Sequence, residues 1–128
     1  MAPGTPVHRR HQTLSQAKQT IDKLRRGVHD WLADHELNRD TRFYTREEWR
    51  ARDEEYLADA PLVLVFEGEL FRVMNGHHEQ SMKLQHDLEQ FVRCLGYLFE
   101  LGHAWSMGFY PLPTGHPHPG LRIHSEQT

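Results

Sequence analysis

The sequence has very little cysteine, since Cys94 is the only one among 128 residues. A single cysteine cannot close a disulfide within the chain and cannot supply the thiolate set of a cysteine-built zinc site. Long apolar runs are also missing. The longest, residues 62–66, is far shorter than the roughly 20 residues that a membrane-spanning helix needs. The basic N-terminal residues are not followed by an apolar stretch, so no secretory signal is expected. These absences predict a cytoplasmic protein that does not enter a membrane.

Sequence motifs for common chemistries are equally scarce. The chain has no G-x-S-x-G turn and no glycine-rich phosphate loop, and Cys94 borders an apolar helical stripe. A nucleophile with a base beside it is therefore not predicted. We assign no catalytic residue and expect no cofactor, and an enzymatic function is disfavoured.

What the sequence does contain is the composition of a folded domain. Hydrophobic residues make up 38% and charged residues 26% of the chain, values typical of globular proteins. Residues 1–12 are basic and lack apolar periodicity, which predicts a flexible arm. Residues 13–111 are predicted to form a single α+β domain, and residues 112–128 a flexible tail rich in proline and histidine.

Apolar spacing predicts two long amphipathic helices, over residues 13–37 and 79–95. Thr45, followed three residues later by Glu48, forms a capping-box pattern that predicts a short helix over residues 46–57.

The β-rich segments predict an antiparallel sheet of about four strands. Two short runs flank Gly68 and Glu69, a pair that suits a type II′ turn, so we expect a hairpin over residues 62–75. This turn would pair Phe66 with Phe71. Two further strands are expected over residues 97–101 and 104–110, with the helices mainly on one side of the sheet.

The second face of this sheet suggests an interaction surface, because it mixes apolar, polar and small residues. We therefore predict a non-catalytic interaction or regulatory module that associates with a protein partner or with itself as a homodimer. An equally weighted alternative is that the helix containing Trp49 simply covers this face. The predicted interface residues are Arg72, Met74, Ser106, Gly108 and Tyr110.

Eleven histidines leave two other functions open. One is a small-molecule site or enzyme pocket with histidine and aromatic walls, for which the candidates are His35, Tyr97, His103 and Trp105. The other is a metal site at His77, His78 and His86. In a straight helix the last two would lie about 12 Å apart along the axis, too far for one zinc ion, so no metal site is favoured.

Nucleic-acid binding by the basic arm is a further alternative. The net charge of −3 gives the domain no general attraction to phosphate, and the basic residues of the first predicted helix scatter around its axis. This function is therefore disfavoured.

Overall fold

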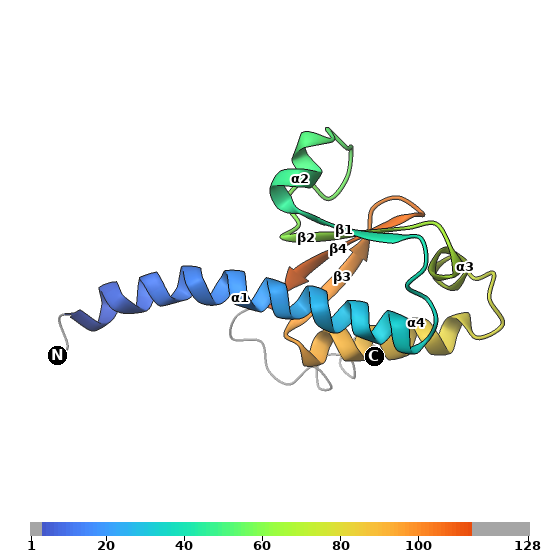
Figure 1. The fold of residues 1–128 in the computed structure, drawn as a ribbon, viewed down its shortest axis with the longest axis horizontal. Helices are drawn as coiled ribbons and strands as arrows, with labels where there is room; N and C mark the ends of the chain where they lie inside the picture. Colours follow the sequence, from blue (N-terminus) through green and yellow to red (C-terminus); the bar gives the residue numbers. More distant parts are fainter. Residues whose placement is uncertain (1–3, 114–128) are drawn as a thin grey trace, which may run out of the picture.

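The computed structural model describes residues 4–113, without the side chains of residues 4–17, and has an α+β fold. The described residues form four helices and one four-stranded sheet (Figure 1). In chain order the elements are α1 (Gly4–Asp34), β1 (Thr41–Thr45), α2 (Arg46–Ala51), β2 (Leu62–Phe66), α3 (Glu69–Met74), α4 (Ser81–Cys94), β3 (Tyr97–Leu101) and β4 (Ser106–Pro111).

The strand order is β1-β2-β4-β3, and every neighbouring pair is antiparallel. Strands β2 and β4 are therefore central, whereas β1 and β3 form the two edges. Leu64 at the centre of β2 pairs with Phe43 of β1 on one side and with Met107 of β4 on the other.

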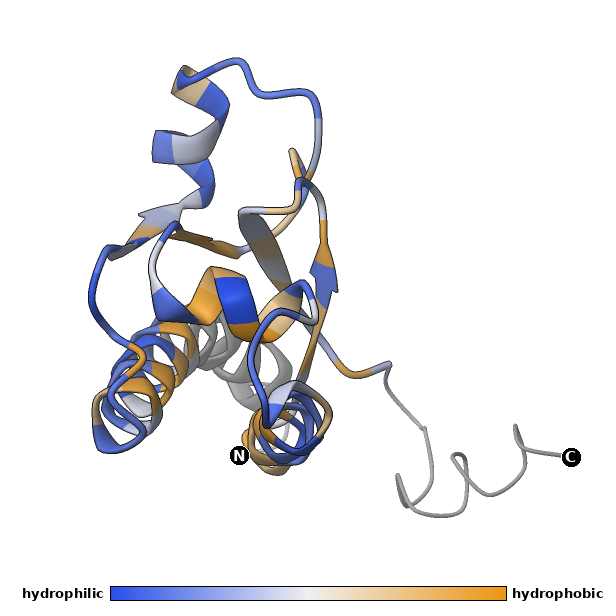
Figure 2. Ribbon diagram, turned by 90° about the vertical axis from the view of Figure 1, so that its right-hand side faces the viewer, coloured by the Kyte–Doolittle hydropathy of each residue, from blue (hydrophilic) through white to orange (hydrophobic). Residues whose placement is uncertain are grey.

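The main core lies between one face of the sheet and the helices α1, α3 and α4. Figures 1 and 2 show α1 and α4 on this side of the sheet and α2 on the opposite side. Helix α1 contributes Leu24, Val28 and Leu32, whose spacing of four residues places all three on one buried stripe. From the sheet, Leu64 and Phe109 are fully buried against these helices.

The predicted hairpin over residues 62–75 is wrong in its second half. Residues 62–66 form β2 as expected, but Glu69–Met74 form the helix α3. Leu70, Val73 and Met74 recur at helical spacing and are all buried, so the same side chains reach the core from a helix. The expected pairing of Phe66 with Phe71 is replaced by a pairing of Phe66 with Thr41. The strand β1, which the sequence analysis missed, takes the place of the second hairpin strand.

The other predicted elements are present with shifted ends. The capping box at Thr45 is confirmed, since its hydroxyl accepts from Glu48 N at 3.1 Å and its N–H donates to Glu48 Oε1 at 2.9 Å. Helix α2 ends at Ala51, six residues before the predicted end. The strand over residues 97–101 is confirmed, and the last strand begins at Ser106 instead of residue 104.

The N-terminal end of the chain differs from expectation where the structure describes it. Helix α1 begins at Gly4, so residues 4–12 of the predicted arm are helical, and Figure 1 shows this part of the helix extending beyond the sheet. Most of the predicted tail, residues 114–128, lies outside the described residues.

Cys94 is exposed and not packed in the core. Among the described residues, no helix has the length and apolar character to cross a membrane.

Candidate functional site

The face predicted to be an interface is covered by the chain itself. Helix α2 and the loop that follows it form a second small core, in which Trp49 and Ala60 are buried against Val63. A Cβ built on Gly108 would lie 2.9 Å from Ala60 Cβ, so the loop sits directly on the strand. Trp49 Nε1 donates to Tyr56 O at 2.8 Å and ties the loop to the helix.

The five predicted interface residues do not form one surface. Arg72 and Met74 lie on α3, where Met74 belongs to the main core. Gly108 is buried under the loop after α2, and Ser106 is buried beside His103. Tyr110 packs against the small core that contains Trp49. The alternative in which the Trp49 helix covers this face therefore agrees with the structure.

The four residues of the predicted pocket are also dispersed. His103 stacks on Trp105 with ring centroids 4.0 Å apart, at the turn between β3 and β4. His35 stacks on Trp31 at the end of α1, and its Nδ1 lies 2.7 Å from Trp31 O. Tyr97 is buried at the start of β3. Only the pair of His103 and Trp105 comes together as predicted.

His103 takes part in an arrangement that resembles a catalytic triad in composition. Its Nδ1 lies 2.8 Å from Ser106 Oγ, and its Nε2 lies 3.7 Å from Glu54 Oε1. Ser106 is fully buried, however, and its hydroxyl also accepts from His103 N at 2.9 Å. A serine without solvent access cannot attack a substrate, so these contacts shape the turn and do not form a nucleophile.

Arginine and aromatic side chains surround the same turn. The Arg52 guanidinium lies 5.0 Å from the centre of the Tyr44 ring and 5.2 Å from that of Trp49, and it donates to Glu54 Oε2 at 2.8 Å. The hydrogen bond to Glu54 is the main cause of the raised pKa of Arg52. An open hollow of about 530 Å³ lies beside this cluster, with Tyr44, Arg52, Glu54 and Trp105 among its lining residues. Arg52 and Glu54 already bind each other, whereas Asp40, Arg42 and Glu67 in the same lining make no ion pair with the described residues.

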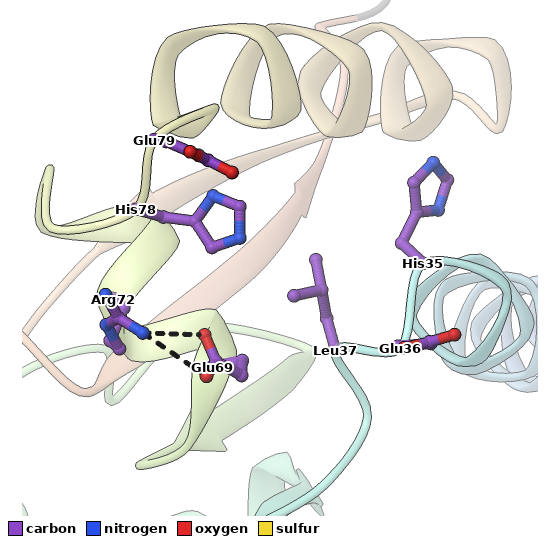
Figure 3. Close-up of a pocket in the computed structure, with 7 residues that line it drawn as sticks. All are labelled: His35, Glu36, Leu37, Glu69, Arg72, His78 and Glu79. Atoms are coloured by element: carbon purple, nitrogen blue, oxygen red, sulfur yellow. Dashed lines mark hydrogen bonds and ion pairs between the residues drawn. The ribbon is translucent and has the colours of Figure 1, made fainter.

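A polar pocket of about 420 Å³ lies between the end of α1, helix α3 and the segment before α4 (Figure 3). His78 Nδ1 accepts from Gln80 N at 3.0 Å, and Arg72 donates to Glu69 at 3.4 Å and to His77 O at 2.9 Å. Figure 3 shows Leu37 between His78 and His35, so the two imidazoles do not converge. Glu36, Glu69 and Glu79 complete the lining with Arg72.

The weak metal candidates His77, His78 and His86 are not assembled into a site. Within the described part of the chain, no group of three or more histidine, cysteine, aspartate or glutamate side chains is placed to hold a metal ion. His86 instead lines a separate hollow between α4 and β3.

The edge strand β3 presents unpaired backbone groups. Gly96 O accepts from Leu112 N at 2.9 Å and Gly102 N donates to Ser106 O at 3.0 Å, so the even-numbered positions of β3 carry the hydrogen bonds to β4. The N–H and C=O groups of Tyr97, Phe99 and Leu101 therefore point away from the sheet. No other described strand pairs with them.

Apolar side chains accompany these free backbone groups. Leu101 is 46% exposed at the end of β3, and Met82 of α4 is 86% exposed. Between α4 and β3 lies a hollow of about 320 Å³ whose lining includes Met82, Glu89 and Phe99. Sequence patterns did not identify this surface, because they did not establish which strand lies at the edge.

Arg93 lies further along α4. Its side chain is only 10% exposed, its Nη2 lies 3.8 Å from Glu89 Oε2, and its Nε and Nη1 atoms are buried without a hydrogen-bond partner among the described residues. A buried guanidinium with two unsatisfied nitrogens is costly for a folded chain.

A larger and more apolar cleft, of about 680 Å³, opens where α1 passes the ends of the sheet. Tyr97 reaches it from the start of β3 and Pro111 from the end of β4. Burial raises the pKa of the Tyr97 hydroxyl.

Nucleic-acid binding by the basic arm remains a prediction, because the side chains of residues 1–17 lie outside the description.

Comparison with protein-family models, curated protein sequences and solved structures finds no match to this chain.

Proposed function

We propose that this chain is a non-catalytic protein-interaction module that associates with a second copy of itself through the β3 edge of its sheet. The observation that carries the proposal is the coincidence of unpaired backbone groups on β3 with the exposed apolar side chains of Met82 and Leu101. Long or apolar sheet edges readily pair with another strand, and natural proteins usually protect them.

The opposite edge is better protected. On β1 the outward-facing backbone groups belong to Thr41, Phe43 and Thr45, since Glu67 N donates to Asp40 O at 3.1 Å in the ladder with β2. The N–H of Thr45 is already occupied by the capping box. These features favour β3 over β1 as the docking strand.

A second copy suits the β3 edge in its chemistry. Antiparallel pairing of two β3 strands about Phe99 would place Glu100 opposite Leu98 of the partner subunit, so no like charges would face each other along the ladder. The two α4 helices would then lie side by side on one face of a continuous sheet.

The test is the mass of the protein in solution as its concentration rises. We expect the wild-type chain to approach twice its mass of 15.1 kDa in sedimentation equilibrium. The double variant Met82→Lys, Leu101→Lys places charge on the edge and should stay monomeric with an unchanged circular dichroism spectrum. Ala33→Lys, an exposed substitution on α1, is the matched control and should associate as the wild type does.

A wild-type chain that remains monomeric throughout the accessible concentration range would contradict the proposal. Equal association of the wild type and the double variant would contradict its assignment to β3.

A further inference from the structure

The cleft beside α1 has a lining and a volume typical of a ligand site. Its apolar surface comes from Ile21 on α1, from Pro61 before β2 and from Pro111 at the end of β4. A volume of about 680 Å³ falls within the range of small-molecule sites. Five separate parts of the chain converge on it, because residues at the start of α2 and Tyr97 at the start of β3 complete the lining.

Tyr97 supplies an unused polar group to this cleft. Only 6% of the residue is exposed, and its ring belongs to the main core. Its hydroxyl makes no hydrogen bond to the described residues and is not fully enclosed, so it is accessible from the cleft. A tyrosine hydroxyl is protonated at neutral pH and can donate a hydrogen bond, and burial raises the pKa of this one further.

The charged residues at the rim favour an anion. Lys18 and Arg46 line the cleft and make no ion pair with the described residues; Arg46 only donates one hydrogen bond, to Asp59 O at 3.1 Å. Of the two acids in the lining, Asp22 lies 3.8 Å from Arg25 and is partly neutralised, which leaves Glu47. Two unpaired cations therefore face one unpaired carboxylate.

We infer that the cleft binds a small organic carboxylate with an apolar body. The body would lie against Ile21, Pro61 and Pro111, while the carboxylate would accept from the Tyr97 hydroxyl and be balanced by Lys18 and Arg46. This inference does not depend on association through β3.

Octanoate is a suitable probe, because it combines a carboxylate with a short aliphatic chain. The sequence contains only two isoleucines, Ile21 and Ile123, so labelling the isoleucine methyl groups gives a simple spectrum with one reporter in the cleft. The Ile21→Val variant assigns that signal. We expect octanoate to shift the Ile21 methyl signal in a saturable manner, and uncharged octan-1-ol to bind at least about fivefold more weakly.

Two variants with matched controls test the assigned contacts. Tyr97→Phe removes only the hydroxyl and should weaken octanoate binding about tenfold, whereas Tyr110→Phe, outside the cleft, should not change it. Arg46→Gln should weaken binding about two- to fivefold, and Arg50→Gln, one turn further along α2, should have no effect.

Three results would overturn the inference. The first is an Ile21 signal that does not move up to the concentration at which octanoate forms micelles. The second is binding of octan-1-ol that equals binding of octanoate. The third is unchanged affinity in both Tyr97→Phe and Arg46→Gln.

Discussion

Replacing Gly108 with alanine should destabilise the fold, although the change adds only one methyl group. The added Cβ would lie 2.9 Å from Ala60 Cβ and 3.0 Å from Leu57 Cδ2. Carbon atoms without a bond between them pack best at about 3.5–4.0 Å, so the loop after α2 must move outward by several tenths of an ångström. Overpacking of this kind costs about 1–3 kcal/mol, more than the 0.4–1 kcal/mol that alanine gains by restricting the unfolded chain.

Urea unfolding followed by tryptophan fluorescence measures this effect, because Trp49 and Trp105 both lie in the affected cluster. A net loss of about 1–2 kcal/mol would lower the melting temperature by about 4–8 °C in a chain of this size. The double variant Gly108→Ala, Ala60→Gly moves the methyl group to the other side of the contact and should recover part of the loss. A single variant that is as stable as the wild type would refute the close packing of the loop on β4.

Three further outcomes follow from local contacts. Thr45→Ala removes the helix cap of α2 and should lower the free energy of unfolding by about 1 kcal/mol in the same urea experiment. Arg93→Met replaces the poorly paired guanidinium with an apolar side chain of similar length and should be neutral or stabilising, as measured by thermal unfolding. The hydrogen bond from Lys83 lowers the pKa of Asp87, so this carboxylate stabilises the fold above its unfolded pKa and loses that contribution as the pH falls through its folded pKa. Asp87→Asn should therefore reduce stability near neutral pH but have little effect in strong acid, as compared by thermal unfolding at the two pH values.

The wrong hairpin prediction shows that the apolar pattern of a short segment does not distinguish a strand from a helix. In the segment from Leu70 to Asn75 the apolar residues satisfy both a two-residue and a helical period, and a run of six residues is too short to distinguish them. The position of the neighbours decides the outcome. Strand β2 is already paired on both sides, with β1 and β4, so no free edge remains for a hairpin partner. A helix buries Leu70 and Val73 without needing one.

The missed strand β1 had a local signal. Residues 41–45 contain two threonines, a phenylalanine and a tyrosine, all of which favour strands. The segment ends at Thr45, whose capping-box pattern predicts only the helix that follows. The long helices were predictable because α1 and α4 repeat their apolar spacing over several turns, which a short segment cannot do.

The candidate surfaces depend on the tertiary arrangement of the chain, which sequence patterns do not contain. Alternation along residues 97–101 predicts a strand, but not that it is an edge, and the edge position is what exposes the backbone of Phe99. The cleft at Tyr97 likewise needs the convergence of five separate segments. The histidine and aromatic content predicts a pocket that includes His35 and His103, but the fold places these two residues in separate aromatic contacts.

The two proposed surfaces share Tyr97 but use different parts of it, so a side-chain substitution can separate them by experiment. The backbone of Tyr97 points outward at the start of the β3 edge, while its side chain lines the cleft beside α1. Tyr97→Phe leaves the backbone and the edge intact, so it should weaken octanoate binding and leave association unchanged. The charges in Met82→Lys, Leu101→Lys lie outside the lining of the cleft, so this variant should lose association and keep octanoate binding. If either variant altered both properties, the two sites would be coupled through β3, and each ligand would have to change the affinity of the other by the same factor.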